Sequence, residues 1–240
     1  MLDQRSSPPK PITEIWRPDL VALPQLTLAR RFFRQFARLM LKLLKFLFLD
    51  VTITGMENFP RQGPALVVIN HLGDADSVLL GATLPFMIEA MGKIELNDHW
   101  FVGPVFRAYG IIWVHRGRPD RKALRAALDG LAEGRLVLIA PEGRESLIGG
   151  LEEGSAGAAF LALKSGAPII PIAMTGTENN TIFRNMKRLK RSQVTLSVGK
   201  PFFLKEQADR QTTLREGTRQ IMESLASLLP ETYRGNYKSL

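Results

Sequence analysis

The chain has 240 residues and a formal net charge of +9, with 32 Lys and Arg against 23 Asp and Glu. Its composition, 45% hydrophobic and 23% charged, indicates a globular protein with a sizeable core and argues against disorder. The absence of cysteine excludes disulfides, Cys-ligated metal centres and a thiol nucleophile. A three-histidine zinc site would need all three histidines of the chain, so we expect no metal.

The positive charge is concentrated in two segments that contain no acid. Residues 30–45 hold six Lys and Arg, and residues 184–191 hold five. Such patches indicate an anionic partner: nucleic acid, an acidic membrane surface or a phosphorylated substrate. We expect no nucleic-acid partner, because the cations and aromatics are not arranged as platforms for stacking bases.

The chain shows no sign of a membrane-spanning segment. Its first residues lack the layout of a signal peptide, and its longest stretch without Asp, Glu, Lys or Arg, Ser165–Thr177, has 13 residues. We divide the chain into a Pro-rich N-terminal segment (1–25), an amphipathic basic helix (26–50), one main domain (51–230) and a C-terminal tail (231–240).

Apolar runs and helical stretches alternate along the domain. Strands are predicted at 51–54, 65–69, 86–90, 111–114, 136–139, 169–174 and 194–198. Helices are predicted at about 26–49, 76–84, 99–108, 119–133, 155–165 and 205–229. Alternating strands and helices predict an α/β domain with a central, mostly parallel sheet flanked by helices and preceded by the amphipathic helix.

The amphipathic helix allows two interpretations. Its cations step by 3, 4, 4 and 3 residues and form one stripe, opposite an apolar side that includes Phe36. It could pack on the body with its charges in water, or lie at a lipid interface with its cations reaching anionic head groups. The uniform positive sign favours the lipid interface, since soluble helices usually mix Glu with Lys. The interface residues are then Arg31, Arg34, Phe36, Arg38, Lys42 and Lys45.

Polar residues follow the apolar strand that ends at Ile69. His71 leaves the strand, Gly73 permits a turn, and Asp76 begins the next helix. Folding back of the carboxylate would orient the imidazole and stabilise its charged form, as a general base requires. The alternative is an ordinary loop histidine followed by an N-capping acid, for which Asp74 is a candidate.

Two further strand ends carry charges. Arg116 and Arg118 follow the strand 111–114, and arginine suits bidentate binding of phosphate. The segment Pro141-Glu142-Gly143-Arg144 follows the strand 136–139, where the glycine lets backbone amides approach a ligand. Either group could instead be a polar turn at the surface.

The run with Pro168 and Pro171 is expected to be an edge strand or its approach, because proline removes a ladder donor. There is no Gly-x-Ser-x-Gly elbow, no complete phosphate loop and no dinucleotide fingerprint. With no obvious nucleophile, direct transfer assisted by a histidine base is favoured.

Four blocks in order resemble the glycerolipid acyltransferases, the lysophosphatidic acid acyltransferase family. They are Asn70-His71 with Asp76, the Arg116 block, Pro141-Glu142-Gly143, and Pro168-Ile169-Ile170-Pro171, spread over about residues 51–200. Two departures concern the acceptor: Arg144 stands one place earlier than the family's arginine, and Ala156 replaces a common lysine.

The resemblance implies an O-acyltransferase with His71 as general base and Asp76 as its orienting acid. Arg116, Glu142, Gly143 and Arg144 would hold the glycerol phosphate, with Asn70 and Arg118 in support. The donor would be acyl-CoA or acyl-carrier protein, the acceptor a lysolipid, and no cofactor would be needed. The expected location is the cytoplasmic face of a membrane. A thioesterase using the same pair and a non-catalytic anionic-lipid-binding protein are the alternatives.

Overall fold

The computed structural model describes residues 9–117, 119–206 and 209–238. The helices are α1 (Leu28–Phe48), α2 (Ala75–Thr83), α3 (Val102–Tyr109), α4 (Arg121–Ala132), α5 (Gly157–Ser165), α6 (Asn179–Lys187) and α7 (Arg210–Leu228). The strands are β1 (Leu49–Thr54), β2 (Ala65–Ile69), β3 (Ile88–Lys93), β4 (Ile112–Val114), β5 (Leu136–Ile139), β6 (Ile169–Thr175) and β7 (Ser192–Val198). Short 3-10 helices lie at Pro18–Leu20, Met56–Asn58, Ile94–Asp98, Glu231–Tyr233 and Gly235–Tyr237.

Within the described residues the seven strands form one sheet in the order β1-β7-β6-β2-β5-β3-β4. All neighbours are parallel except β6 and β7, which are antiparallel. The predicted α/β domain with a mostly parallel sheet and a preceding helix is therefore confirmed. Because β2, β5 and β6 are parallel neighbours, the loops that follow them meet at one edge of the sheet.

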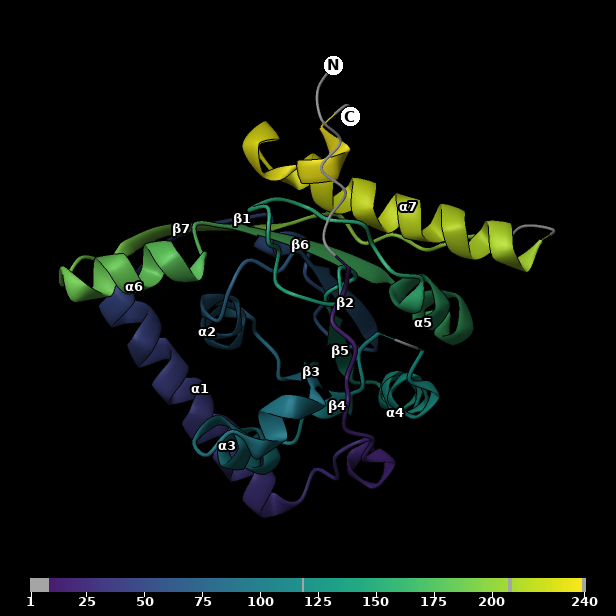
Figure 1. Ribbon diagram of the computed structural model, residues 1–240, viewed down its shortest axis with the longest axis horizontal. Coiled ribbons are helices and arrows are strands. Elements are labelled where there is room, and N and C mark those ends of the chain that lie inside the picture. The colour runs from purple at the N-terminus through teal and green to yellow at the C-terminus, as the bar shows by residue number, and fades with distance from the viewer. Residues whose placement is uncertain (1–8, 118, 207–208, 239–240) are drawn as a thin grey trace.

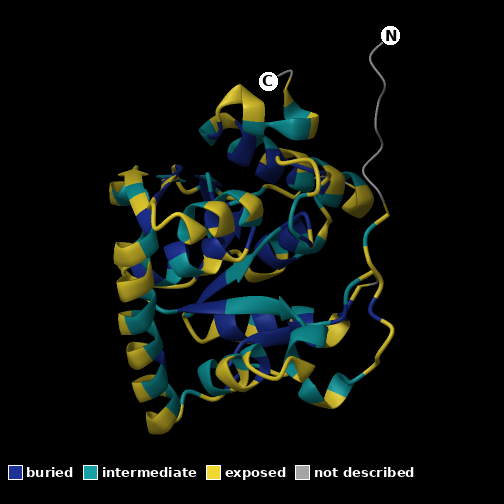
Figure 2. Cartoon of the chain, turned by 60° about the vertical axis from the view of Figure 1, so that its left-hand side comes forward, coloured by how far each residue is buried: buried dark blue, intermediate teal, exposed yellow. Residues whose placement is uncertain are grey.

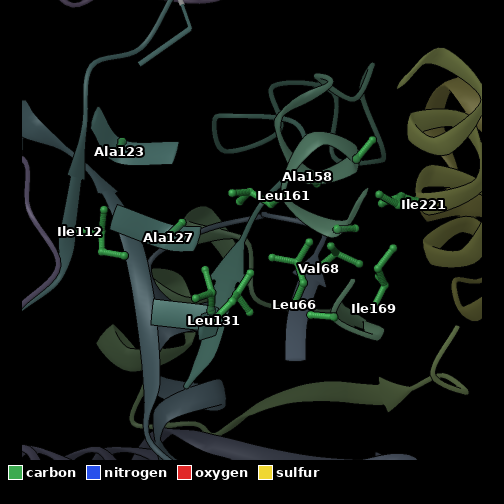
Figure 3. Close-up of a cluster of buried hydrophobic side chains, with 14 of the residues drawn as sticks. Leu66, Val68, Ile112, Ala123, Ala127, Leu131, Ala158, Leu161, Ile169 and Ile221 are labelled. Carbon is green, nitrogen blue, oxygen red and sulfur yellow. The ribbon is translucent and has the colours of Figure 1, made fainter. Parts of the chain in front are cut away.

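Strand β2 lies at the centre of the sheet and is buried on both faces. Leu66 and Val68 belong to one core, with apolar residues of α4, α5 and α7 (Figure 3). Val67 and Ile69 belong to a second core, with Leu79 and other apolar residues of α2 and α6. The resulting layers, helices on either side of the sheet, are visible in Figure 1. This double burial explains why β2 reads as an unbroken apolar run.

One helix was missed, and the prediction for one strand was wrong. Helix α6 was not predicted, because its polar sequence contributes a single buried residue, Ile182. Strand β6 was expected at an edge because of its prolines, yet it pairs with both β2 and β7. Pro171 is tolerated there because the β6–β7 ladder begins only at Ile172, so the missing N–H falls at the end of that ladder. The Pro171 carbonyl still accepts a hydrogen bond from the Gly199 N–H.

Helix α1 turns its cationic side toward the body of the protein. The Arg34 guanidinium is only 3% exposed and makes a bidentate ion pair with Glu89 of β3, at 2.7 Å for each of the two bonds. It also donates to the carbonyls of Tyr109 and Gly110. Along the same side, α1 packs so closely on α2 that a Cβ at Gly81 would lie 2.4 Å from Leu41 Cδ1.

The apolar side of α1 consequently faces outward (Figure 2). Its exposed members are Leu28, Phe32, Phe36, Leu39, Leu43, Leu44, Phe46 and Leu47. We call these eight residues the outer face of α1. The described residues contain no helix that is both long and apolar enough to cross a bilayer.

The expected interface set is corrected at two positions. Arg34 is buried in its ion pair, and Arg38 is partly buried and donates to the carbonyls of Leu84 and Pro85. Neither cation can reach lipid head groups while these bonds persist. Arg31, Phe36 and Lys42 are exposed, and Lys45 is partly exposed. Arg34 and Arg38 face the body because their guanidinium groups bond to carbonyls and a carboxylate there. An apolar side chain in their place would leave those buried acceptors without a donor.

We expect Arg34→Ala to lower the free energy of unfolding by about 3 kcal/mol, because among the described residues it leaves the buried Glu89 carboxylate with the longer contact to Arg135 Nη1 at 3.5 Å alone. Urea denaturation of the variant and the wild type measures this. Gln35→Ala, at an exposed position beside Arg34 on the same helix, is the control and should change stability little. Equal stability of the Arg34 variant and the control would contradict the importance of the ion pair.

Candidate active site

The His71 side chain stands immediately beyond the carboxyl end of β2. Its Nδ1 lies 2.8 Å from Oδ2 of Asp76, in the first turn of α2. The same carboxylate oxygen accepts hydrogen bonds from the backbone N–H groups of Leu72 and Gly73, at 2.8 and 3.2 Å. The turn predicted at Gly73 therefore does bring the acid back onto the imidazole. Asp74 occupies the N-cap position of α2, as predicted, but its side chain makes no capping hydrogen bond.

The pair has one sealed end and one accessible end. The Asp76 side chain is 1% exposed, whereas that of His71 is 27% exposed. Oδ2 already accepts two N–H groups, so it acts as an acceptor toward Nδ1 as well. The neutral His71 ring then carries its proton on Nδ1, and the lone pair of Nε2 is available. Burial disfavours the imidazolium, but the hydrogen bond and charge of Asp76, together with Glu145 and Glu142, outweigh it and raise the pKa of His71.

The backbone around His71 is held by neighbouring strands. The side-chain amide of Asn70 is buried, donates to the Met174 carbonyl and accepts from the Met174 N–H of β6. The His71 N–H donates to Glu142 Oε1 at 3.2 Å, and the His71 carbonyl accepts from the Ser146 N–H at 2.7 Å. Asn70 thus fixes the residue before His71 against β6, and the loop after β5 holds His71 from the other side.

Glu142 is fully buried and links two loops. Its Oε2 accepts from the Glu152 N–H at 2.8 Å, while its Oε1 holds His71. Burial raises the pKa of Glu142 to about 7, against the opposing effect of these two backbone hydrogen bonds. Both carboxylate oxygens are therefore engaged by the protein, and the placement of Glu142 does not match the phosphate-binding role expected for it.

Arg144 is also turned inward. Its side chain is 6% exposed, its Nε and Nη2 both donate to Glu152 Oε2, and its Nη1 donates to the Pro9 carbonyl. The guanidinium braces the loop and leaves little edge for a ligand. Gly143 has φ +73 with open space where a Cβ would stand, so the turn and not crowding favours glycine. The expected phosphate-binding role of Arg144 is corrected accordingly.

Arg116 retains a partly free side chain, 23% exposed. Its Nη2 lies 3.4 Å from Glu95 Oε1, and its Nε has no partner among the described residues. Its backbone N–H donates to the Thr13 hydroxyl, which in turn donates to Glu95. Burial disfavours the Glu95 carboxylate, but hydrogen bonds and the charge of Arg116 prevail and lower the pKa of Glu95. Arg118 lies outside the described residues.

A second histidine–acid pair was missed by sequence reasoning. His115 Nδ1 lies 2.6 Å from Asp120 Oδ2, with the same five-residue spacing and the same glycine two residues after the histidine as in the first pair. This pair is sealed: His115 is 1% exposed, its Nε2 accepts the Arg17 N–H at 2.9 Å, and Trp16 covers the ring at 4.2 Å. The repeated His-x-Gly-x-x-Asp pattern was the available signal.

The described residues contain no cluster of three or more His, Asp or Glu able to hold a metal ion. A family model described as acyltransferase matches residues 50–175, which include both histidine–acid pairs and the loop after β5. The chain belongs to the acyltransferase family.

Curated acyltransferases are similar over much of the chain. A 1-acyl-sn-glycerol-3-phosphate acyltransferase of Borreliella burgdorferi is 32% identical over 143 residues, 58% of this chain and 56% of the relative. One of Chlamydomonas reinhardtii is 32% identical over 77% of this chain and 54% of its own length. One of Bacillus subtilis is 26% identical over 75% and 90%. The chain thus spans little more than half the length of the first two.

The fold is shared with a solved acyltransferase structure. The crystal structure of the 1-acyl-sn-glycerophosphate acyltransferase PlsC from Thermotoga maritima superposes with a TM-score of 0.61 at 22% identity. The alignment covers 85% of this chain and 84% of the other. At this identity the likeness concerns the fold alone.

We expect the free energy of unfolding of this chain to contain a pH-dependent contribution from Glu142. Because its pKa is raised from about 4.5 to about 7 by folding, the folded state holds a proton that the unfolded state releases. This contribution is complete below pH 4.5 and is lost as the pH rises to 7, by up to about 3 kcal/mol.

Urea denaturation of the wild type and Glu142→Gln across this range tests the expectation. The glutamine variant should be less stable at low pH, because its amide NH₂ faces a backbone donor, and it should lack the downward slope. Parallel pH profiles for the two proteins would contradict the assignment.

Proposed function

We propose that the chain transfers a fatty acyl group from a thioester donor, acyl-CoA or acyl-carrier protein, to the hydroxyl of a lysophosphatidic acid-like acceptor. The observation that carries this is the His71–Asp76 pair at 2.8 Å, with the His71 side chain 27% exposed and the Asp76 side chain buried. His71 Nε2 takes the proton of the acceptor hydroxyl, and the hydroxyl oxygen attacks the thioester carbonyl. The carbon–sulfur bond then breaks, and the proton passes to the leaving thiolate.

Asp76 supports each stage of this transfer. Its carboxylate keeps the Nδ1 proton in place and stabilises the imidazolium that forms after proton abstraction. General-base assistance of this kind contributes roughly 10²–10⁴-fold to the rate. The thioester is already activated, so the proposed reaction requires no cofactor.

Arg116 is the remaining candidate for the acceptor phosphate. Its guanidinium is partly exposed and is held by a single long contact to Glu95, unlike the fully engaged Arg144. A dianionic phosphate would outcompete that contact by offering a bidentate partner. Arg118 follows two residues later in the sequence.

The outer face of α1 supports association with a lipid surface. Its eight large apolar side chains are exposed together along one side of the helix, which is an arrangement typical of interfacial helices. Substrate and product of the proposed reaction are lipids, so an enzyme lying on the bilayer meets both. We place the protein on the cytoplasmic face of an anionic membrane, where acyl-CoA and acyl-carrier protein are available.

We expect His71→Ala to lose at least about 100-fold in acyl transfer to lysophosphatidic acid, because the general base is removed. A labelled thioester donor and product mass measure the reaction. His99→Ala changes an exposed histidine that lies outside the pair, and it should keep near wild-type turnover. Urea denaturation should show that the His71 variant remains folded.

Near wild-type turnover of His71→Ala would show that His71 is not the general base. Release of free fatty acid that does not depend on added lysolipid would instead indicate a thioesterase using water. Lipid binding by a wild-type protein without either activity would indicate a non-catalytic lipid-binding protein.

We expect Phe36→Ser to weaken binding to anionic vesicles about three- to tenfold, since it removes one large apolar side chain from the lipid contact. Co-sedimentation with phosphatidylglycerol-containing vesicles measures this. Gln35→Ser, at the adjacent exposed position, is the matched control and should bind as the wild type. Equal binding by the two variants would exclude the outer face of α1 as the contact.

A further inference from the structure

The turn between α6 and β7 presents a leucine to solvent. Leu189 N–H donates to the Met186 carbonyl, and Lys190 N–H donates to the Asn185 carbonyl, each at 2.9–3.0 Å. These two bonds are those of a Schellman cap, in which the residue after the C-cap adopts the left-handed conformation. Leu189 occupies that position with φ +53. Glycine is the residue that this position favours.

Leu189 is unfavourable in water on two counts. Among the described residues it is the one non-glycine with positive φ, and its side chain is 94% exposed. Glycine would relieve the backbone and would remove the exposed apolar surface as well. Local choices that oppose folding in this way are typical of functional positions.

The side chains around Leu189 are cationic. Residues 179–191 contain no acid, and Arg184, Lys187, Arg188, Lys190 and Arg191 are all exposed. We call residues 184–191 the basic tip. Phe183, directly before it, is half exposed. An apolar apex among uniform positive charge has the composition of a segment that contacts an anionic bilayer.

The basic tip adjoins the C-terminal end of α1 (Figure 1). Arg191 donates to the Leu49 carbonyl, the residue that follows α1. The Arg191 guanidinium also lies 5.8 Å from the centre of the Phe46 ring, which belongs to the outer face of α1. The exposed apolar helix and the basic tip are therefore held against each other by direct contacts.

We infer that the basic tip is a second lipid contact, in which Leu189 enters the acyl-chain boundary of an anionic leaflet and the cations at 184–190 bind lipid phosphates. The inference rests on the membrane association proposed above and deepens it. A single interfacial helix leaves the protein free to roll about the helix axis. A second contact away from that axis would restrict this rotation and fix the orientation of the site relative to the bilayer.

The test is Leu189→Gly, because folding and binding should respond in opposite directions. Thermal stability should stay equal or rise, since glycine adopts the left-handed conformation freely. Binding to vesicles with phosphatidylglycerol should fall about three- to tenfold, because one leucine no longer leaves water. Binding to pure phosphatidylcholine vesicles should be weak for both proteins. Unchanged binding to the anionic vesicles would overturn the inference.

A label reports the position of the tip directly. The chain has no cysteine, so Leu189→Cys carries a single environment-sensitive fluorophore. Its emission should shift to the blue on addition of anionic vesicles, whereas a label at Gln211→Cys, exposed at the start of α7, should not respond. A label at position 189 that stays in water would also overturn the inference.

The outcome is separable from that of the proposed reaction, because vesicle binding needs no turnover. If the protein bound vesicles through Leu189 but transferred no acyl group, the lipid contact would be supported and the proposed acyl transfer would be contradicted. If Leu189→Gly weakened the use of soluble, short-chain acyl-CoA without vesicles, the basic tip would be a donor site, and the lipid contact would be overturned.

Discussion

The buried ion pair between Arg34 and Glu89 decides which side of α1 meets the outside. An amphipathic helix normally buries its apolar side, but here a guanidinium and further cations face carbonyls and a carboxylate on the body. A charge that is removed from water needs such hydrogen-bonding partners. The body of the protein offers them to the cations of α1 when the helix has this rotation. The apolar side is thereby left exposed, and the helix becomes a surface for lipid while still packed on the protein.

The candidate active site is likewise held in place by buried polar groups that hydrogen-bond within the protein. Glu142, Arg144 and Glu152 form a buried network in the loop after β5, and through Glu142 this network holds the backbone of His71. Glu142 and Arg144, which the family resemblance assigns to substrate binding, instead stabilise this loop. With this network in place, the imidazole of His71 is partly exposed. The Arg116 guanidinium has weaker contacts with the protein than that of Arg144.

The two histidine–acid pairs show how context separates chemistry from structure. Both have the same spacing, and both join Nδ1 to a carboxylate at less than 3 Å. In the first, the ring is partly exposed. In the second, the N-terminal segment donates the Arg17 N–H to Nε2 and covers the ring with Trp16. A histidine whose second nitrogen is occupied cannot accept a proton from a substrate, so the second pair stabilises the fold.

Much of the protein followed from sequence alone, because it rests on local periodicity and short spacings. The runs at Ala65–Ile69 and Leu136–Ile139 were predicted with their observed bounds, and a glycine between His71 and Asp76 sufficed to predict that they could meet. Other features depend on contacts distant in sequence. The central place of β6, the burial of Arg34 and the closure of His115 by Arg17 each require a partner that lies 30 or more residues away. Periodicity shows that a side chain lies on a polar or an apolar face, but only the tertiary structure decides what that face meets.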